Sequence, residues 1–159
     1  MLSLFDQGAF SPAPNPFNMA AHVLKHADAM PAKTALSVMS LEGAENWTYG
    51  QLKAAVLGTG AGLLEAGLKP GDRVLMRLGN TVEFPIAYLG AIAVGLVPAP
   101  TSSQLTEPEV AKMVAELAPS AILRDPAIAC PDTPDIDQVT LEALESMRDH
   151  APAAFQMGD

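Results

Sequence analysis

The chain has 159 residues, which is long enough for one globular domain. Of these, 49% are hydrophobic and 17% are charged, a composition that excludes an intrinsically disordered protein. Its 18 acidic and 9 basic residues give a net charge of −9 without a basic cluster, so nucleic acid is not an expected partner. The single cysteine, Cys130, excludes an internal disulfide and favours a reducing, cytoplasmic compartment.

Two stretches test whether the chain is targeted to a membrane. Residues 1–17 are rich in Pro, Ser and Asn and lack the basic and apolar regions of a secretion signal, so we expect a leader on the surface. Residues 84–100 carry no charge, but Pro and Gly interrupt them repeatedly. A buried helix that leads into a buried strand therefore fits this stretch better than a membrane span.

The first predicted elements are a helix and a hairpin. Asn18 is a suitable N-cap for a helix over residues 18–30, which Pro31 would end. Two short apolar runs at 34–39 and 46–48 flank a turn and predict a β-hairpin.

Helices and strands then alternate along the chain. The predicted helices cover residues 48–66, 80–94, 106–118 and 141–147, and the predicted strands cover residues 73–77, 96–99 and 120–123. Capping-box spacing marks three of the helix starts, at Thr48 and Gln51, Asn80 and Glu83, and Thr106 and Glu109.

This alternation predicts an α/β fold with an open, mostly parallel sheet and flanking helices, plus the short N-terminal β-hairpin. The chain beyond residue 124 is dominated by Pro and Asp until the small helix at 141–147. We expect residues 148–159 to lie unanchored.

Glycines at 58, 60 and 62 are the first candidate for ligand chemistry. A dinucleotide fingerprint needs its glycines directly after a strand, whereas these lie inside the predicted helix over 48–66. We therefore predict close helix packing and reject phosphate binding here.

Metal-binding and nucleophilic sites are also weakly supported. His22 and His26 have the spacing of a zinc protease motif, but its general-base Glu is missing. Asp132, Asp135 and Asp137 lack the glycine turn and final Glu of a calcium loop, and Cys130 has no nearby His in the sequence. We predict no metal site and no catalytic residue in the 159 residues.

Thr101, Ser102, Ser103 and Gln104 are the remaining candidates. They directly follow a predicted buried strand, and open α/β sheets bind ligands at the carboxyl ends of their strands. Their side chains could donate to a phosphate or a carbonyl, although the same residue types are ordinary turn formers.

Several segments, in this order, resemble the adenylate-forming superfamily of acyl-CoA synthetases, luciferases and peptide-synthetase adenylation domains. They are WTYGQL at 47–52, GLKPGDRV at 67–74, Asn80 with EF at 83–84, YLGA at 88–91, GLVP at 95–98 and LTEPE at 105–109. The resemblance spans residues 16–123 and implies that the chain is part of the larger N-terminal domain of such an enzyme.

The resemblance also implies an activity. AMP-forming acyl-CoA ligases convert a carboxylate, Mg-ATP and coenzyme A into acyl-CoA, AMP and pyrophosphate. The family's phosphate-binding loop, of the form TSGTTGxPK, is not found in the sequence, nor are its later nucleotide motifs. We therefore expect the 159 residues alone to be inactive, with ATP, Mg and coenzyme A serving the full-length enzyme.

The expected organisation is a leader at 1–17, a portion of the synthetase N-terminal subdomain at 18–124, and a tail at 125–159 that leads to the missing phosphate-binding loop. The loop at 101–104 would face the carboxylate or coenzyme A. Two alternatives stay open: an adenylation domain that loads a carrier protein, and a standalone noncatalytic paralogue that acts as a binding or interaction module.

Overall fold

A computed structural model describes residues 8–9, 12, 14–41 and 43–158. Most of the predicted leader, together with Glu42 of the predicted turn and Asp159, lies outside the described residues. The elements are α1 Met19–Leu24, β1 Thr34–Ser40, β2 Gly43–Thr48, α2 Tyr49–Glu65, β3 Arg73–Arg77, α3 Glu83–Ala93, β4 Val97–Pro100, α4 Glu107–Leu117, β5 Ala121–Arg124, β6 Asp137–Thr140 and α5 Leu141–Met147.

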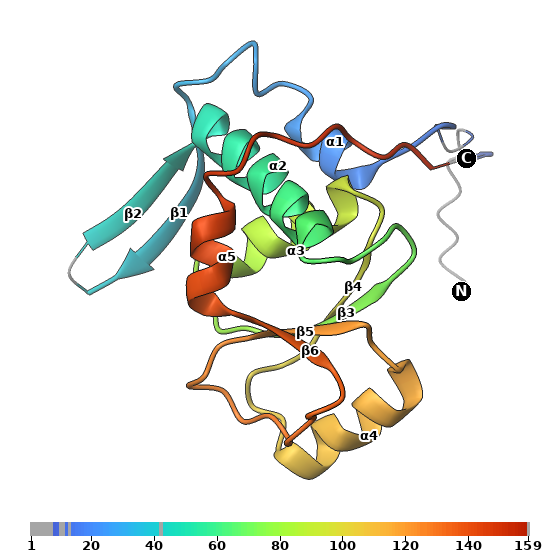
Figure 1. Cartoon of the computed structure of the whole chain (residues 1–159). Helices are drawn as coiled ribbons and strands as arrows, with labels where there is room; N and C mark the ends of the chain where they lie inside the picture. Colours follow the sequence, from blue (N-terminus) through green and yellow to red (C-terminus); the bar gives the residue numbers. More distant parts are fainter. Residues whose placement is uncertain (1–7, 10–11, 13, 42, 159) are drawn as a thin grey trace, which may run out of the picture.

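The centre of the structure is a four-stranded parallel sheet with strand order β4-β3-β5-β6. The strands β1 and β2 form a separate antiparallel hairpin that projects from the side of the molecule (Figure 1). The predicted α/β class, with an open parallel sheet and an N-terminal hairpin, is confirmed.

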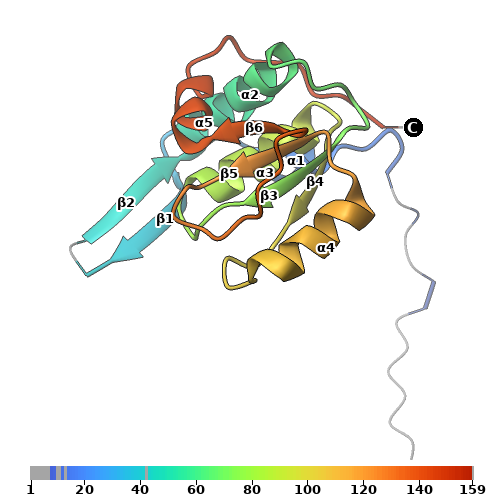
Figure 2. The same cartoon turned by 60° about the horizontal axis from the view of Figure 1, so that its bottom comes forward.

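Helices cover both faces of the sheet, as a parallel sheet requires. Helices α2, α3 and α5 lie on one face and α4 lies on the other (Figures 1 and 2). Alternation along β3 matches this layering, because Val74 and Met76 join the core beneath α3 and α5, whereas Leu75 packs with Val110 of α4.

Local capping explains two of the helix starts. Thr48 and Gln51 form the predicted capping box at the start of α2. At the start of α4 the carboxylate of Glu109 accepts hydrogen bonds from the backbone N–H and the hydroxyl of Thr106, at 2.8 and 2.7 Å. Both predictions are confirmed.

The capping box predicted at Asn80 and Glu83 is wrong. The N-cap of α3 is Val82, which makes no side-chain cap hydrogen bond. Glu83 is instead buried and ion-paired with Arg148. Pro85 falls in the first turn of α3, where its missing N–H leaves no helical hydrogen bond unmade.

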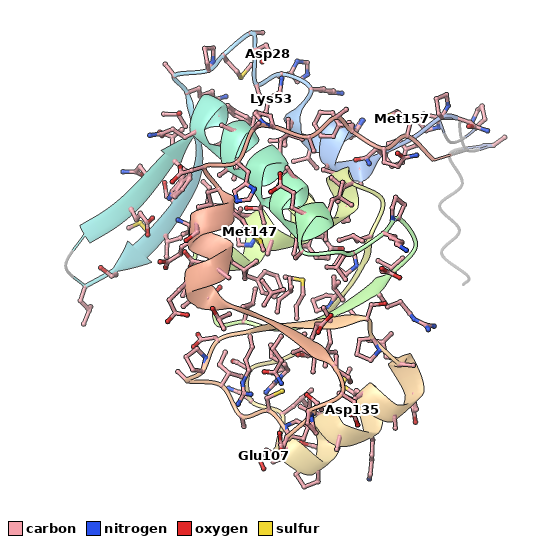
Figure 3. The ribbon with its side chains drawn as sticks, in the orientation of Figure 1. Asp28, Lys53, Glu107, Asp135, Met147 and Met157 are labelled. Carbon is pink, nitrogen blue, oxygen red and sulfur yellow. The ribbon has the colours of Figure 1, made fainter. Side chains whose placement is uncertain are left out.

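Helix α1 is shorter than predicted, because it ends at Leu24 and residues 25–29 form turns. The N–H of Ala27 bonds to the carbonyl three residues back instead of four. In this turn Asp28 reaches across to Lys53 of α2, with 2.7 Å between the charged groups (Figure 3).

The segment after residue 124 contributes more to the fold than its composition predicts. Strand β6 was not predicted; it pairs with β5 in register, with Leu123 opposite Val139. The expectation that residues 148–159 lie unanchored is wrong for the described part. The N–H of Ala153 bonds to Leu57 and that of Gln156 bonds to Ala93, at 3.1 and 2.7 Å.

Candidate functional site

The loop predicted to bind a ligand lies where the sequence places it, at the carboxyl edge of the sheet. It follows β4, and the residues after β3 lie beside it. Together they line a surface hollow of about 210 Å³, which we call the carboxyl-edge hollow. Its lining residues are Leu78, Gly79, Asn80, Phe84, Thr101, Ser102 and Ser103. Gln104, the fourth predicted residue, is exposed and is not among them.

Thr101 cannot donate a hydrogen bond to a ligand as predicted, because its hydroxyl already donates within the protein. Its hydroxyl donates to the carbonyl of Met76 at 2.7 Å and accepts from Arg77 at 3.0 Å. A hydroxyl has one proton to donate, and here that proton already forms the hydrogen bond to the carbonyl of Met76. Thr101 therefore fixes the start of the loop.

Ser102 and Ser103 are the loop residues whose hydroxyls remain able to donate. Both are exposed, and among the residues that the structure describes the Ser102 hydroxyl oxygen accepts a hydrogen bond only from the N–H of Gln104, at 3.3 Å. Within the described part of the chain the Ser103 hydroxyl makes no hydrogen bond. Phe84 supplies an apolar wall and stacks against Tyr88, with ring centroids 6.4 Å apart.

Arg77, which the sequence analysis did not single out, lies beneath this loop. Its side chain is 0% exposed, although it carries a charge. Burial lowers the pKa of Arg77, and nearby Cys130 opposes that shift. Its position as the last residue of an apolar strand was the available signal, because a charged residue there must find acceptors.

The glycines at 58, 60 and 62 serve helix packing, as predicted. A Cβ at Gly58 would overlap the carbonyl of Arg148, and one at Gly62 would overlap Met147 on α5. Figure 3 shows Met147 on the α5 helix beside α2. A Cβ at Gly60 would approach the carbonyl of Gly90 on α3 to 2.9 Å. These glycines let α2 approach both neighbouring helices.

The other candidates lie apart from the hollow. His22 and His26 are exposed on and just after α1, and the His22 ring packs on Phe17 with centroids 5.6 Å apart. Among the described residues, no three His, Cys, Asp or Glu side chains gather closely enough to hold a metal ion. Cys130 is buried, and burial raises the pKa of its thiol above the ordinary range.

A second polar cluster joins α5 to the hairpin. Arg148 lies 5.3 Å from the centre of the Trp47 ring and pairs with Glu83 of α3. Beside it is a surface hollow of about 340 Å³ lined by Trp47, Gln51, Ala54, Ala55, Glu145, Arg148 and Asp149. Three segments distant in sequence are connected here.

Comparison with known families decides what kind of domain this is. A family model described as AMP-binding enzyme matches residues 23–156. The chain belongs to the AMP-binding enzyme family. The resemblance seen in the sequence motifs is thereby confirmed.

Curated relatives of the chain are CoA ligases. It is 33% identical over 83 residues to 4-coumarate–CoA ligase 5 of Oryza sativa subsp. japonica, covering 52% of this chain and 15% of that protein. It is 35% identical over 79 residues to benzoate–CoA ligase of Thauera aromatica, covering 49% and 15%. It is 29% identical over 96 residues to long-chain-fatty-acid–CoA ligase FadD13 of Mycobacterium tuberculosis, covering 60% and 18%. The chain thus spans less than a fifth of these relatives.

Solved structures show the same fold. The N-terminal domain of FACL13 from Mycobacterium tuberculosis matches with a TM-score of 0.74 and 26% identity, over 89% of this chain and 39% of that one. A benzoate CoA ligase from Burkholderia xenovorans LB400 matches with a TM-score of 0.70 and 24% identity, over 87% and 30%. The chain therefore has the fold of part of the N-terminal domain of an adenylate-forming enzyme. No described helix has the length and hydropathy to span a membrane.

Proposed function

We propose that residues 1–159 form the N-terminal part of an AMP-forming acyl-CoA ligase. Such an enzyme activates a carboxylic acid with ATP, releases pyrophosphate, and transfers the acyl group to the thiol of coenzyme A with release of AMP. The observation that carries the proposal is the family match over residues 23–156. The CoA ligases among the relatives support it and favour an aromatic or fatty acid as substrate.

Within this chain, the proposed contribution to the site is the carboxyl-edge hollow. The hydroxyls of Ser102 and Ser103 would donate to a carbonyl or phosphate oxygen of the carboxylate substrate or of coenzyme A, and Gln104 would reach the ligand from outside the hollow. Phe84 would hold an apolar part of the same ligand. Thr101 keeps the loop in place, because both of its hydrogen bonds are made inside the protein.

Phosphoryl chemistry is assigned to residues outside 1–159. It requires backbone N–H groups and cations arranged around the polyphosphate, and a glycine-rich loop of that kind is not found in this sequence. The described residues also offer no cluster of three His, Cys, Asp or Glu side chains that could hold Mg²⁺. We propose that 18–124 belongs to the N-terminal subdomain, that 125–159 leads toward the phosphate-binding loop, and that the enzyme is cytoplasmic.

The test is carboxylate-dependent exchange of radioactive pyrophosphate into ATP. It compares the 159 residues with a polypeptide in which they are continued by the downstream reading frame. Exchange by the longer polypeptide alone is the expected result. Exchange by the 159 residues would require a phosphate site that the sequence does not reveal, and no exchange by either would favour the noncatalytic binding module.

A further inference from the structure

Arg77 is a charged residue that is fully buried among apolar side chains at the end of β3. It ends β3, the strand that lies between β4 and β5, and strand alternation puts it on the same face as Leu75. That face packs apolar side chains such as Leu75 and Ile122 against α4. Burying a guanidinium beside them costs free energy unless its donors are satisfied. Among the described residues no carboxylate forms an ion pair with it.

Backbone carbonyls and one hydroxyl take the place of a carboxylate. The Nη1 group of Arg77 donates to the Ser102 carbonyl at 2.6 Å and to the Thr101 hydroxyl, and Nη2 donates to the Leu105 carbonyl at 3.3 Å. The Nε and Nη2 groups also donate to the carbonyl of Ala129, at 3.1 and 2.5 Å. The acceptors thus belong to the loop after β4 and the loop after β5.

The central strand therefore holds the loops of both its neighbours through one side chain. The planar, five-donor guanidinium is suited to this, because its donors have a fixed geometry relative to one another. The Ser102 carbonyl accepts from Arg77 and from the N–H of Leu105, so its position also sets the turn that follows. That turn carries the exposed hydroxyls of Ser102 and Ser103.

We propose that Arg77 is the positioning residue of the carboxyl-edge hollow: it fixes the loop at 101–105 so that Ser102 and Ser103 present their hydroxyls to the substrate. This inference rests on the proposed function for its catalytic consequence, but the ordering of the two loops is independent of it. An apolar side chain of similar length would fill the same space beside Leu75. It would leave the carbonyl of Ala129 without the donors of Arg77, and the carbonyl of Ser102 with the N–H of Leu105 alone.

The ordering is tested on the 159-residue chain itself by hydrogen exchange with mass spectrometry. The variants are Arg77→Met, which keeps the volume and removes every donor, and Arg77→Lys, which keeps the charge on a single nitrogen. Arg73→Lys is the control, because Arg73 is the exposed arginine at the other end of the same strand. If Arg77→Met does not fold, Arg77→Lys carries the comparison.

In the Arg77 variants, amide hydrogen exchange is expected to rise about tenfold in the peptides that contain residues 101–105 and 127–130, because these loops open locally. Exchange in the hairpin at 34–48 should not change. The Arg73→Lys control should match the wild type in both loops. Unchanged exchange in the two loops would overturn the inference. An equal rise in the loops and the hairpin would also overturn it, because it would show a general loss of stability.

The consequence for activity is tested in the longer polypeptide with Arg77→Lys. The KM of the substrate that the loop faces, the carboxylate or coenzyme A, should rise about tenfold, with kcat per folded enzyme changed far less. A fall in kcat with both KM values unchanged would contradict the positioning role. A wild-type enzyme without ligase activity would refute the proposed function, while the hydrogen-exchange result would still decide whether Arg77 orders the loops.

Discussion

Gly58 and Gly62 lie one turn apart on α2, at the place where α5 crosses it. A glycine inside a helix normally costs about 0.5–1 kcal/mol relative to alanine, so an alanine would be stabilising if space allowed. At Gly58 the added Cβ would meet backbone, the carbonyl of Arg148, which cannot rotate away. At Gly62 it would meet the flexible side chain of Met147.

We therefore predict that Gly58→Ala lowers the free energy of unfolding by about 1–3 kcal/mol, the usual cost of overpacking a core. Gly62→Ala should cost less, because Met147 can adopt another rotamer. Urea denaturation of the two variants measures the difference. A Gly58→Ala chain more stable than the wild type would show that α2 and α5 do not pack as described.

Glu109 predicts a pH dependence. Hydrogen bonds from the backbone N–H and hydroxyl of Thr106 lower the pKa of this carboxyl in the folded chain. A folded-state pKa below the unfolded value, which is about 4.3 for Glu, stabilises the fold above that pH, and the stabilisation is lost as the pH falls through the folded-state pKa. Glu109→Ala should thus be less stable than the wild type at pH 7, and the gap should close on acidification.

Urea midpoints measured at several pH values check this expectation. Glu116→Ala removes an exposed carboxylate from the other end of the same helix and serves as the control. A constant gap between wild type and Glu109→Ala from neutral to acidic pH would contradict the capping role of the ionised carboxylate.

Single residues also show how far the sequence can be interpreted. The cap at Thr48 was predictable because its partner, Gln51, is three residues away. The role of Arg77 was not, because its acceptors lie 24 to 52 residues further along the chain. For the loop at 101–104 the sequence predicted the place at the sheet edge. It did not predict that the Thr101 hydroxyl is already bound.

At the scale of elements, Arg148 joins three parts of the fold: it follows α5, packs over Trp47 of β2 and pairs with Glu83 of α3. The side chains of Arg148 and Glu83 are 17% and 9% exposed, so removing one leaves the other nearly buried without a partner. We predict that Arg148→Met costs about 3 kcal/mol of stability, as for other broken buried pairs.

A double-mutant cycle measures this coupling. Combining Arg148→Met with Glu83→Gln should recover part of the loss, because the buried carboxylate is then gone. Lys53→Met breaks the pair with Asp28, whose side chain is 85% exposed, and should cost less than about 1 kcal/mol. Equal costs for Lys53→Met and Arg148→Met would show that burial does not make the Arg148–Glu83 pair the more important of the two.

The order of most elements followed from periodicity and turn residues, since each helix and strand carries its own local signal. Strand β6 did not, because of its four residues only Val139 is buried and apolar. Its extended form is selected by pairing with β5, a long-range contact. The stretch at 151–158 is likewise held by other segments, and Asn18 donates to the carbonyl of Gln156 at 2.8 Å.

At the scale of the whole molecule, the two edges of the sheet differ. Strand β4 contains Pro98 and Pro100, which have no N–H to offer, so this edge is a poor template for a further strand. Strand β6 forms the opposite edge and contains no proline.

The family was predictable from the sequence because its motifs include turns that need particular residues. Gly71 is one such residue, since its φ of 93° lies in the left-handed region that favours glycine.

We propose that this chain belongs to an acid–thiol ligase, and detection of the thioester product tests that proposal. A polypeptide that contains residues 1–159 and the downstream reading frame would be incubated with ATP, Mg²⁺, coenzyme A and benzoate, 4-coumarate or a long-chain fatty acid, and its products identified by mass spectrometry. We predict an acyl-CoA thioester with one equivalent of AMP. An acyl-adenylate that is never transferred to coenzyme A would refute the proposed ligase activity, and so would the absence of any ATP-dependent product.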